Sequence, residues 1–155
     1  MARRPEVHVR RSGRHARGSV ISSPAPAPLV LIVDDHAVTG EMYSMYLAAQ
    51  GLRCVAAADG VTAIRVAEAV RPDVIVMDLS LPRRDGWEAI RRLKQRSSTS
   101  HIPIIACTGN VAGGSAEWAI EAGCDAYVIE PCLPEQLFEQ IRILLARKAS
   151  RQRPA

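Results

Sequence analysis

The sequence has 155 residues, of which 48% are hydrophobic and 23% are charged, and this suits one globular domain with flexible ends and no second domain. No apolar run approaches the roughly 18 to 20 residues that cross a bilayer, and the Arg-rich start lacks the apolar stretch of a secretory signal. We therefore expect a soluble, cytoplasmic protein without a membrane span. No CxxC pair occurs, so buried reduced thiols are expected at Cys54, Cys107, Cys124 and Cys132.

The net charge of +4 is divided unevenly along the chain. Residues 1–28 hold six Arg and one acidic residue, residues 147–155 hold four basic residues and no acidic one, and residues 29–146 hold ten basic and fifteen acidic residues. We expect a disordered basic tail with a Pro/Ala linker over 1–28, a folded domain over 29–147 and a basic tail over 148–155. The tails could contact nucleic acid or an acidic surface weakly, or have no specific partner. A mitochondrial-type transit peptide is a minor alternative.

From Leu29 onward, short apolar segments alternate with amphipathic ones, separated by turn signals such as Asp59-Gly60 and Arg71-Pro72. The apolar runs predict strands over residues 29–33, 52–57, 73–77, 102–107 and 126–129. The helical periodicities predict helices over residues 37–50, 61–70, 87–96, 114–122 and 134–147. In the first of these helices, the apolar residues at helical spacing are Val38, Met42, Met45, Tyr46 and Ala49.

Five repeats of strand and helix predict an α/β fold with a parallel sheet, because each crossover must lie over a face of the sheet. Both faces are then covered, which explains why the strands are continuous apolar runs. In such sheets functional groups gather beyond the carboxyl ends of the strands. Five polar residues lie at these ends: Asp34, Asp35, Asp78, Thr108 and Glu130.

Three of these residues predict a metal site. Asp34-Asp35 follows the first strand and Asp78 ends the third, so their carboxylates converge if the two strands are parallel neighbours. Carboxylates that close repel one another unless a divalent cation with a preference for oxygen ligands, most plausibly Mg²⁺, lies between them. One of the carboxylates could then accept a phosphoryl group.

A set of motifs in this order resembles the receiver domain of bacterial two-component response regulators. The resemblance covers about residues 29–147 and implies a flavodoxin-like five-stranded sheet with strand order 2-1-3-4-5 and helices on both faces. The residues that carry it are Asp34-Asp35, Asp78, Leu81-Pro82, Asp85-Gly86, Thr108, Tyr127 and Glu130-Pro131.

The resemblance also implies a role for each residue. Asp78 would accept a phosphoryl group from a phosphohistidine on a histidine kinase or a histidine phosphotransfer protein. Asp34, Asp35 and Asp78 would hold Mg²⁺, which balances charge on the transferring phosphoryl oxygens. The Thr108 hydroxyl would contact a phosphoryl oxygen, and Tyr127 would swing inward in response. Taken alone, Thr108 could also be an ordinary Thr at a strand end, and Tyr127 could be an ordinary half-buried Tyr.

Residue 130 departs from the family pattern, because receivers of this type carry Lys before Pro131 and this chain has Glu130. A carboxylate there removes an attractive contact to Asp78 and adds a repulsive one, which could weaken or abolish phosphorylation. Alternatively, the added carboxylate could tighten cation binding or share a proton with a neighbour. A third alternative is that Glu130 turns outward and pairs with an Arg.

Several residues near the site are weaker candidates. Ser80 and Asn110 would tune the lifetime of the acyl phosphate, although polar loop caps are an equal interpretation. Gly109 stands where a small residue such as Ala commonly follows the Thr, and Gly adds backbone freedom. His36 is best interpreted as an exposed residue at the start of a helix rather than as a ligand.

The output surface is expected on the fourth helix, fifth strand and fifth helix, where Trp118 either is exposed or packs inward. The first functional hypothesis is a single-domain response regulator that signals through protein contacts and is not a conventional enzyme. The alternative is a degenerate receiver that works as a phosphorylation-independent interaction module, as Glu130 would allow. A small hydrolase that uses Asp78 as a transient nucleophile is the weakest hypothesis.

Overall fold

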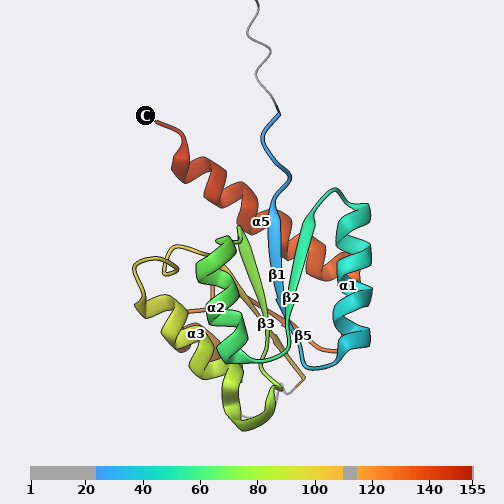
Figure 1. Ribbon diagram of the computed structural model, residues 1–155, viewed down its shortest axis with the longest axis vertical. Coiled ribbons are helices and arrows are strands. Elements are labelled where there is room, and N and C mark those ends of the chain that lie inside the picture. The colour runs from blue at the N-terminus through green and yellow to red at the C-terminus, as the bar shows by residue number, and fades with distance from the viewer. Residues whose placement is uncertain (1–23, 110–114, 155) are drawn as a thin grey trace, which may run out of the picture.

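The computed structural model describes residues 24–109 and 115–154, and these form a five-stranded parallel sheet between two layers of helices (Figure 1). The sheet order is β2-β1-β3-β4-β5, so the predicted 2-1-3-4-5 topology and the flavodoxin-like fold are confirmed. The strands are β1 (Leu29–Val33), β2 (Arg53–Ala57), β3 (Val74–Asp78), β4 (Ile104–Thr108) and β5 (Ala126–Ile129).

Each strand is followed by a helix, and a short 3₁₀ turn, η1 (Pro82–Arg84), precedes the third. The helices are α1 (Ala37–Ala49), α2 (Gly60–Val70), α3 (Asp85–Gln95), α4 (Ser115–Ala122) and α5 (Pro134–Gln152). Buried residues of α2, α3 and α4 form one core on one face of the sheet, and those of α1 and α5 form a second core on the other.

Successive residues of β1 supply the two cores in turn. Leu31 and Val33 belong to the core under α2 and α3, whereas Val30 and Ile32 belong to the core under α1 and α5. All four side chains are at most 2% exposed. A strand buried on both faces must be apolar at every position, as the continuous run over residues 29–33 predicted.

The first helix buries a different face from the one that the sequence predicted. Val38 and Met45 are 81% and 74% exposed, whereas Tyr43 and Leu47 are buried in the core that α1 and α5 form on their face of the sheet. Because α1 carries apolar residues on several sides, its periodicity does not select one face. The Tyr43 hydroxyl settles the orientation, since it reaches the Cys132 carbonyl oxygen at 3.2 Å.

The last helix is longer than predicted and runs to Gln152, so most of the expected tail over 148–155 belongs to α5. Lys148 holds this added segment against the sheet, because its Nζ lies 2.9 Å from Asp73 Oδ1. No Pro or Gly interrupts the helix before Pro154.

The start of β1 is anchored to β2 and to the segment before β3. The Arg53 amide donates to the Pro28 carbonyl at 2.9 Å, and the Leu29 amide donates to Asp73 Oδ2 at 2.8 Å. Residues 1–23 lie outside the described residues, so the predicted disordered tail stays a prediction. Within the described ranges, none of the helices combines the length and the apolar character that a membrane span requires.

Candidate functional site

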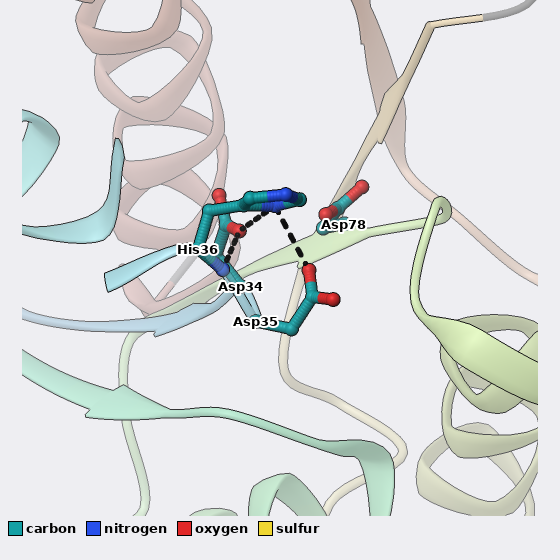
Figure 2. Close-up of side chains that lie close together, drawn as sticks. All are labelled: Asp34, Asp35, His36 and Asp78. Atoms are coloured by element: carbon teal, nitrogen blue, oxygen red, sulfur yellow. Dashed lines mark hydrogen bonds and ion pairs between the residues drawn. The ribbon is translucent and has the colours of Figure 1, made fainter. Parts of the chain in front are cut away.

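Three carboxylates and one imidazole meet where β1 and β3 end. The two strands are hydrogen-bonded neighbours with Val33 opposite Met77, so Asp34 and Asp35 leave the sheet beside Asp78. One ligand atom from each of Asp34, Asp35, His36 and Asp78 lies within 4.8 Å of the others (Figure 2). The convergence that the sequence predicted for the three Asp residues is therefore present in the fold.

Asp78 is the most buried member of this acidic cluster, with 4% of its surface exposed. Its Oδ1 accepts a hydrogen bond of 2.8 Å from the Ser80 amide, which fixes the orientation of the carboxylate. Burial raises the pKa of Asp78, and the charges of Asp34 and Asp35 raise it further, although the hydrogen bond from Ser80 opposes the shift. The ionised form of Asp78 is thus destabilised, and a neighbouring cation would stabilise it.

His36 is exposed, as the sequence predicted, but its ring turns back over the acidic pair (Figure 2). Its Nδ1 lies 3.0 Å from Asp35 Oδ1 and 3.5 Å from Asp34 Oδ1, and 72% of the side chain is exposed. The backbone amide of His36 donates to Asp34 Oδ1 at 2.8 Å. Sequence reasoning did not place the ring at the cluster; the only available signal was that His follows the acidic pair directly.

The cluster fits a hard divalent cation. Three carboxylates supply the oxygen ligands that Mg²⁺ prefers, and Asp35 and His36 lie at the exposed side of the cluster, where water can complete the coordination. Burial first, and then the charges of Asp34 and Asp35, raise the pKa of Asp78, and a cation would oppose both effects. Mg²⁺ is small and retains several waters, so an edge that is open on one side suits it better than a closed cage.

Glu130 adds a fourth carboxylate to this neighbourhood. Burial raises the pKa of Glu130, the charges of Asp78 and Asp34 raise it further, and His36 lowers it. In the part of the chain that the structure describes, no basic side chain forms an ion pair with Glu130, so the outward pairing with Arg is not observed. The Glu130 amide donates to the Thr108 carbonyl at 2.8 Å, which places both residues at adjoining strand ends.

Thr108 and Tyr127 come from adjacent strands but differ in exposure. Thr108 is 5% exposed at the end of β4, next to β3 and Asp78, whereas Tyr127 is 41% exposed on the edge strand β5. Ser80 contributes its amide to Asp78, and nothing lies within 4 Å of the position where a Cβ on Gly109 would stand. Asn110 lies outside the described residues.

A buried polar group lies behind Glu130 and was not anticipated. The Tyr43 hydroxyl lies 3.3 Å from Cys132 Sγ, and it donates to the Cys132 carbonyl. Burial raises the pKa of Tyr43, and burial followed by the charge of Glu130 raises the pKa of Cys107 well above its ordinary value. All four cysteines are free thiols, as the sequence predicted, and these environments keep Cys107 protonated.

Trp118 on α4 is 56% exposed and contacts Trp87 on α3 edge to face, with ring centroids 6.5 Å apart. Both alternatives for Trp118 are therefore met in part, because one ring edge packs on Trp87 while the rest faces solvent. The pair stands on the side of the molecule formed by α3 and α4.

The strand order, the acidic cluster and Thr108 at the end of β4 are the framework of a signalling domain, and a comparison with known families gives the same answer. Residues 30–142 match the model of the response regulator receiver domain. The chain belongs to this family. Receiver domains are phosphoacceptor modules of two-component systems and interact with histidine kinases, so the domain is a signalling module rather than a conventional enzyme, and the hydrolase hypothesis fails.

Two curated relatives illustrate the range of the family. The chain is 37% identical over 118 residues to the probable transcriptional regulatory protein TcrX of Mycobacterium tuberculosis, covering 76% of this chain but only 50% of TcrX. It is 32% identical over 116 residues to the polar-differentiation response regulator DivK of Brucella anthropi, covering 75% of this chain and 94% of DivK. The chain thus spans half the length of one relative and nearly all of the other.

A solved structure bears on the metal. The receiver domain of the sensor histidine kinase PA1611 from Pseudomonas aeruginosa, with a magnesium ion coordinated in its active-site cleft, superposes with a TM-score of 0.71 at 32% identity. The match covers 77% of this chain and 98% of that domain. The acidic cluster of the present receiver is therefore consistent with a Mg²⁺ site.

Proposed function

We propose that Asp78 is the phosphoacceptor and that the domain works in the cytoplasm as a phosphorylation-controlled response regulator. The observation that supports this role is the position of Asp78, which is the buried carboxylate of the acidic cluster and is oriented by the Ser80 amide. One oxygen of this carboxylate would attack phosphorus. The donor would be a phosphohistidine on a histidine kinase or a histidine phosphotransfer protein.

In the transfer, a lone pair of one Asp78 carboxylate oxygen forms the new P–O bond while the P–N bond to the donor imidazole breaks and its electrons return to that ring. The product is an acyl phosphate. Thr108, at the end of the neighbouring strand β4, would donate its hydroxyl to a phosphoryl oxygen. This contact couples the site to β5, because Thr108 pairs with Ile129 two residues from Tyr127.

Asp34, Asp35 and Asp78 would hold Mg²⁺. When bound there, the ion would neutralise charge on the transferring phosphoryl oxygens. His36 already lies against Asp34 and Asp35, so its ring must move aside or lose its contacts when the carboxylates take up a cation.

Glu130 sets the efficiency of this switch. A carboxylate near Asp78 opposes the arriving phosphoryl group, and a like-charge interaction at the effective dielectric of a protein site costs on the order of 1–3 kcal/mol. We propose that phosphorylation still occurs but is slow, and that occupancy depends strongly on Mg²⁺. Ser80 and Asn110 would tune the lifetime of the acyl phosphate.

The output surface would be the face made by α4, β5 and α5. A groove of about 600 Å³ there is lined by Tyr127, Ile129, Cys132 and Glu135, among others. Tyr127 and Ile129 are 41% and 44% exposed, so their apolar surfaces are accessible to a partner protein. Movement of Tyr127 toward Thr108 would change the shape of this groove.

Intact-mass spectrometry after incubation with acetyl phosphate and Mg²⁺ tests the proposal. We expect one phosphoryl adduct on the unaltered chain and none on Asp78→Asn. Glu130→Gln removes the charge with little change of shape, and Glu130→Lys reverses it, so the adduct should increase in that order.

The degenerate-receiver alternative predicts a different pattern. An interaction module would carry no adduct on the unaltered chain, and it would retain its partner contacts in Asp78→Asn. An adduct that persists in Asp78→Asn would contradict the assignment of the phosphoacceptor. Glu130 is the one observation that favours this alternative.

A further inference from the structure

At the end of the sheet opposite to the acidic cluster, a small groove lies between the last turns of α5 and the segment before β4. It has a volume of about 260 Å³, and its lining includes His101, Pro103, Leu144, Arg147 and Arg151. Both the C-terminus and the segment that enters β1 leave the domain at this end (Figure 1). The groove is therefore far from Asp78, at the amino ends of the strands.

Asp125, which lines the groove, and Asp73, which binds the groove residue Lys148, already have cationic partners. Asp125 Oδ2 lies 2.9 Å from Lys94 Nζ and accepts from the Ile104 amide at 2.8 Å. Asp73 lies 2.9 Å from Lys148 Nζ and accepts from the Leu29 amide. Neither carboxylate is left to neutralise a further Arg.

Arg147 and Arg151, in contrast, form no ion pair with any carboxylate among the residues that the structure describes. They lie one turn apart on the same side of α5, where two like charges repel by a few tenths of a kcal/mol. The helix dipole stabilises cations in the last turn of α5 whichever way their side chains point. It therefore does not explain why both Arg side chains line the same groove. Both guanidinium groups are exposed and line the groove together.

The chain also enters the sheet at this end of the domain. The Leu29 amide and Lys148 Nζ both bind the carboxylate of Asp73. The start of β1 is therefore close to the turns of α5 that carry Arg147 and Arg151. Residues 1–28 contain six Arg and one acidic residue. The basic charge at both ends of the chain thus attaches to one end of the fold.

We infer that this basic groove, centred on Arg147 and Arg151, is a binding site for the phosphate backbone of nucleic acid. Arg is the residue that pairs with phosphate oxygens through two parallel N–H donors, and two of the three Lys and Arg side chains that line the groove are Arg. His101, exposed on the opposite wall of the groove, supplies a further donor.

The composition of the surface favours nucleic acid over a lipid bilayer. From Ala146 to Gln152 the exposed residues of α5 are small or polar, and none of the large exposed apolar side chains of the described residues lies on α5. Membrane-surface helices bury an apolar face in the headgroup region, and this segment has none. The absence of an aromatic side chain from the groove predicts backbone binding without sequence reading.

Fluorescence anisotropy with a labelled, mixed-sequence duplex of about 20 base pairs, at potassium chloride between about 50 and 200 mM, tests the inference. The full-length chain is compared with Arg147→Ala/Arg151→Ala. The matched control is Arg65→Ala/Arg92→Ala, which removes the same charge from exposed positions on α2 and α3. Phosphorylation by acetyl phosphate serves as a check of folding, because neither pair lies at the acidic cluster.

We expect the groove variant to bind about tenfold more weakly at low salt and to lower the slope of log affinity against log salt by about 1.8, or 0.9 for each lost phosphate contact. The control should bind within about twofold of the unaltered chain. Equal losses in both variants would show a general charge effect and overturn the assignment. An unaltered affinity in the groove variant would place any binding in the N-terminal segment alone and also overturn it.

Vesicles of phosphatidylserine and phosphatidylcholine form the other arm of the experiment. We expect little binding to them under conditions that saturate the duplex. Binding to vesicles without binding to the duplex would replace nucleic acid with a membrane surface and contradict the inference.

Discussion

Two aspartates flank strand β3, and their surroundings are opposite. Asp73, just before the strand, accepts from the Leu29 amide and from Lys148 Nζ. Burial by itself raises the pKa of Asp73, but these hydrogen bonds and the charges of Lys148 and Arg53 outweigh it, so the net shift is downward. Asp78, at the other end, lies among carboxylates, and burial and their charges raise its pKa.

The contrast separates a structural carboxylate from a functional one. Asp73 ties β1 to α5 and contributes to stability in its ionised form. Asp78 is ionised at a cost, and this cost is what a cation or a phosphoryl group can relieve. Asp73 at one end of the strand thus stabilises the fold, whereas Asp78 at the other end carries a charge that its surroundings destabilise.

The largest effect is expected from closing the space beneath Asp78. A Cβ on Gly86 would lie 2.5 Å from the Asp78 carbonyl oxygen, so Gly86→Ala must push α3 away from β3. We expect a loss of about 2–3 kcal/mol in the free energy of unfolding, measured by urea denaturation, together with reduced phosphorylation.

Gly40→Ala is the matched control, because nothing lies within 4 Å of the Cβ position in α1. It should stabilise the protein by about 0.5–1 kcal/mol, since Ala replaces Gly inside a helix. Equal effects of the two substitutions would show that contact with Asp78 is not what matters.

Asp78→Asn should stabilise the Mg²⁺-free protein by about 1–3 kcal/mol at neutral pH, because it removes a charge that its neighbours repel. Since the folded protein raises this pKa, it binds the proton more tightly than the unfolded chain does. The unfavourable charge is therefore absent below the ordinary pKa of Asp and grows as pH rises through the raised one. The gain from Asn should vanish in acid, as urea midpoints measured from about pH 3 to pH 7 will show.

Asp73→Asn should have the opposite sign and a smaller size. At neutral pH we expect a loss of about 0.5–1 kcal/mol, discounted because the side chain is 35% exposed. The folded pKa is lowered, so this stability is present above the ordinary pKa and disappears as pH falls through the folded one. A stabilising effect at pH 7 would contradict the assigned roles of the two aspartates.

The smallest effect is expected at a surface ion pair away from both aspartates. Arg142 Nη2 lies 2.7 Å from Glu139 Oε1, and both side chains are more than half exposed. Arg142→Ala should leave the free energy of unfolding almost unchanged, because solvent screens this exposed ion pair. The same thermal or urea measurement then gives the baseline against which the changes at Asp73 and Asp78 are judged.

Sequence reasoning predicted well the elements whose residue pattern is compatible with only one structure. The strand over residues 29–33 is apolar at every position because both of its faces are buried, and the acidic pair at its end needed only the strand order to meet Asp78. Helix α1 was oriented wrongly, since its apolar residues surround the axis and only the contact of Tyr43 with Cys132 selects a face.

The candidate site was anticipated in its carboxylates but not in its surroundings. The influence of the Asp78 charge on Glu130 depends on the pairing of β5 with β4, which no local pattern encodes. The extension of α5 to Gln152 is supported by the ion pair between Lys148 and Asp73, which lies 75 residues earlier in the chain. Contacts between such distant residues cannot be obtained from local periodicity.

The sequence by itself determined the alternation of strands and helices, the family, and the set of carboxylates that a phosphoacceptor site requires, because each follows from residue type and local spacing. Only the tertiary structure decided which face of α1 is buried, that the charge of Asp78 acts on Glu130, and that Arg147 and Arg151 line one groove. The physical reason is that burial and charge are summed over groups that the fold, and not the chain order, brings together.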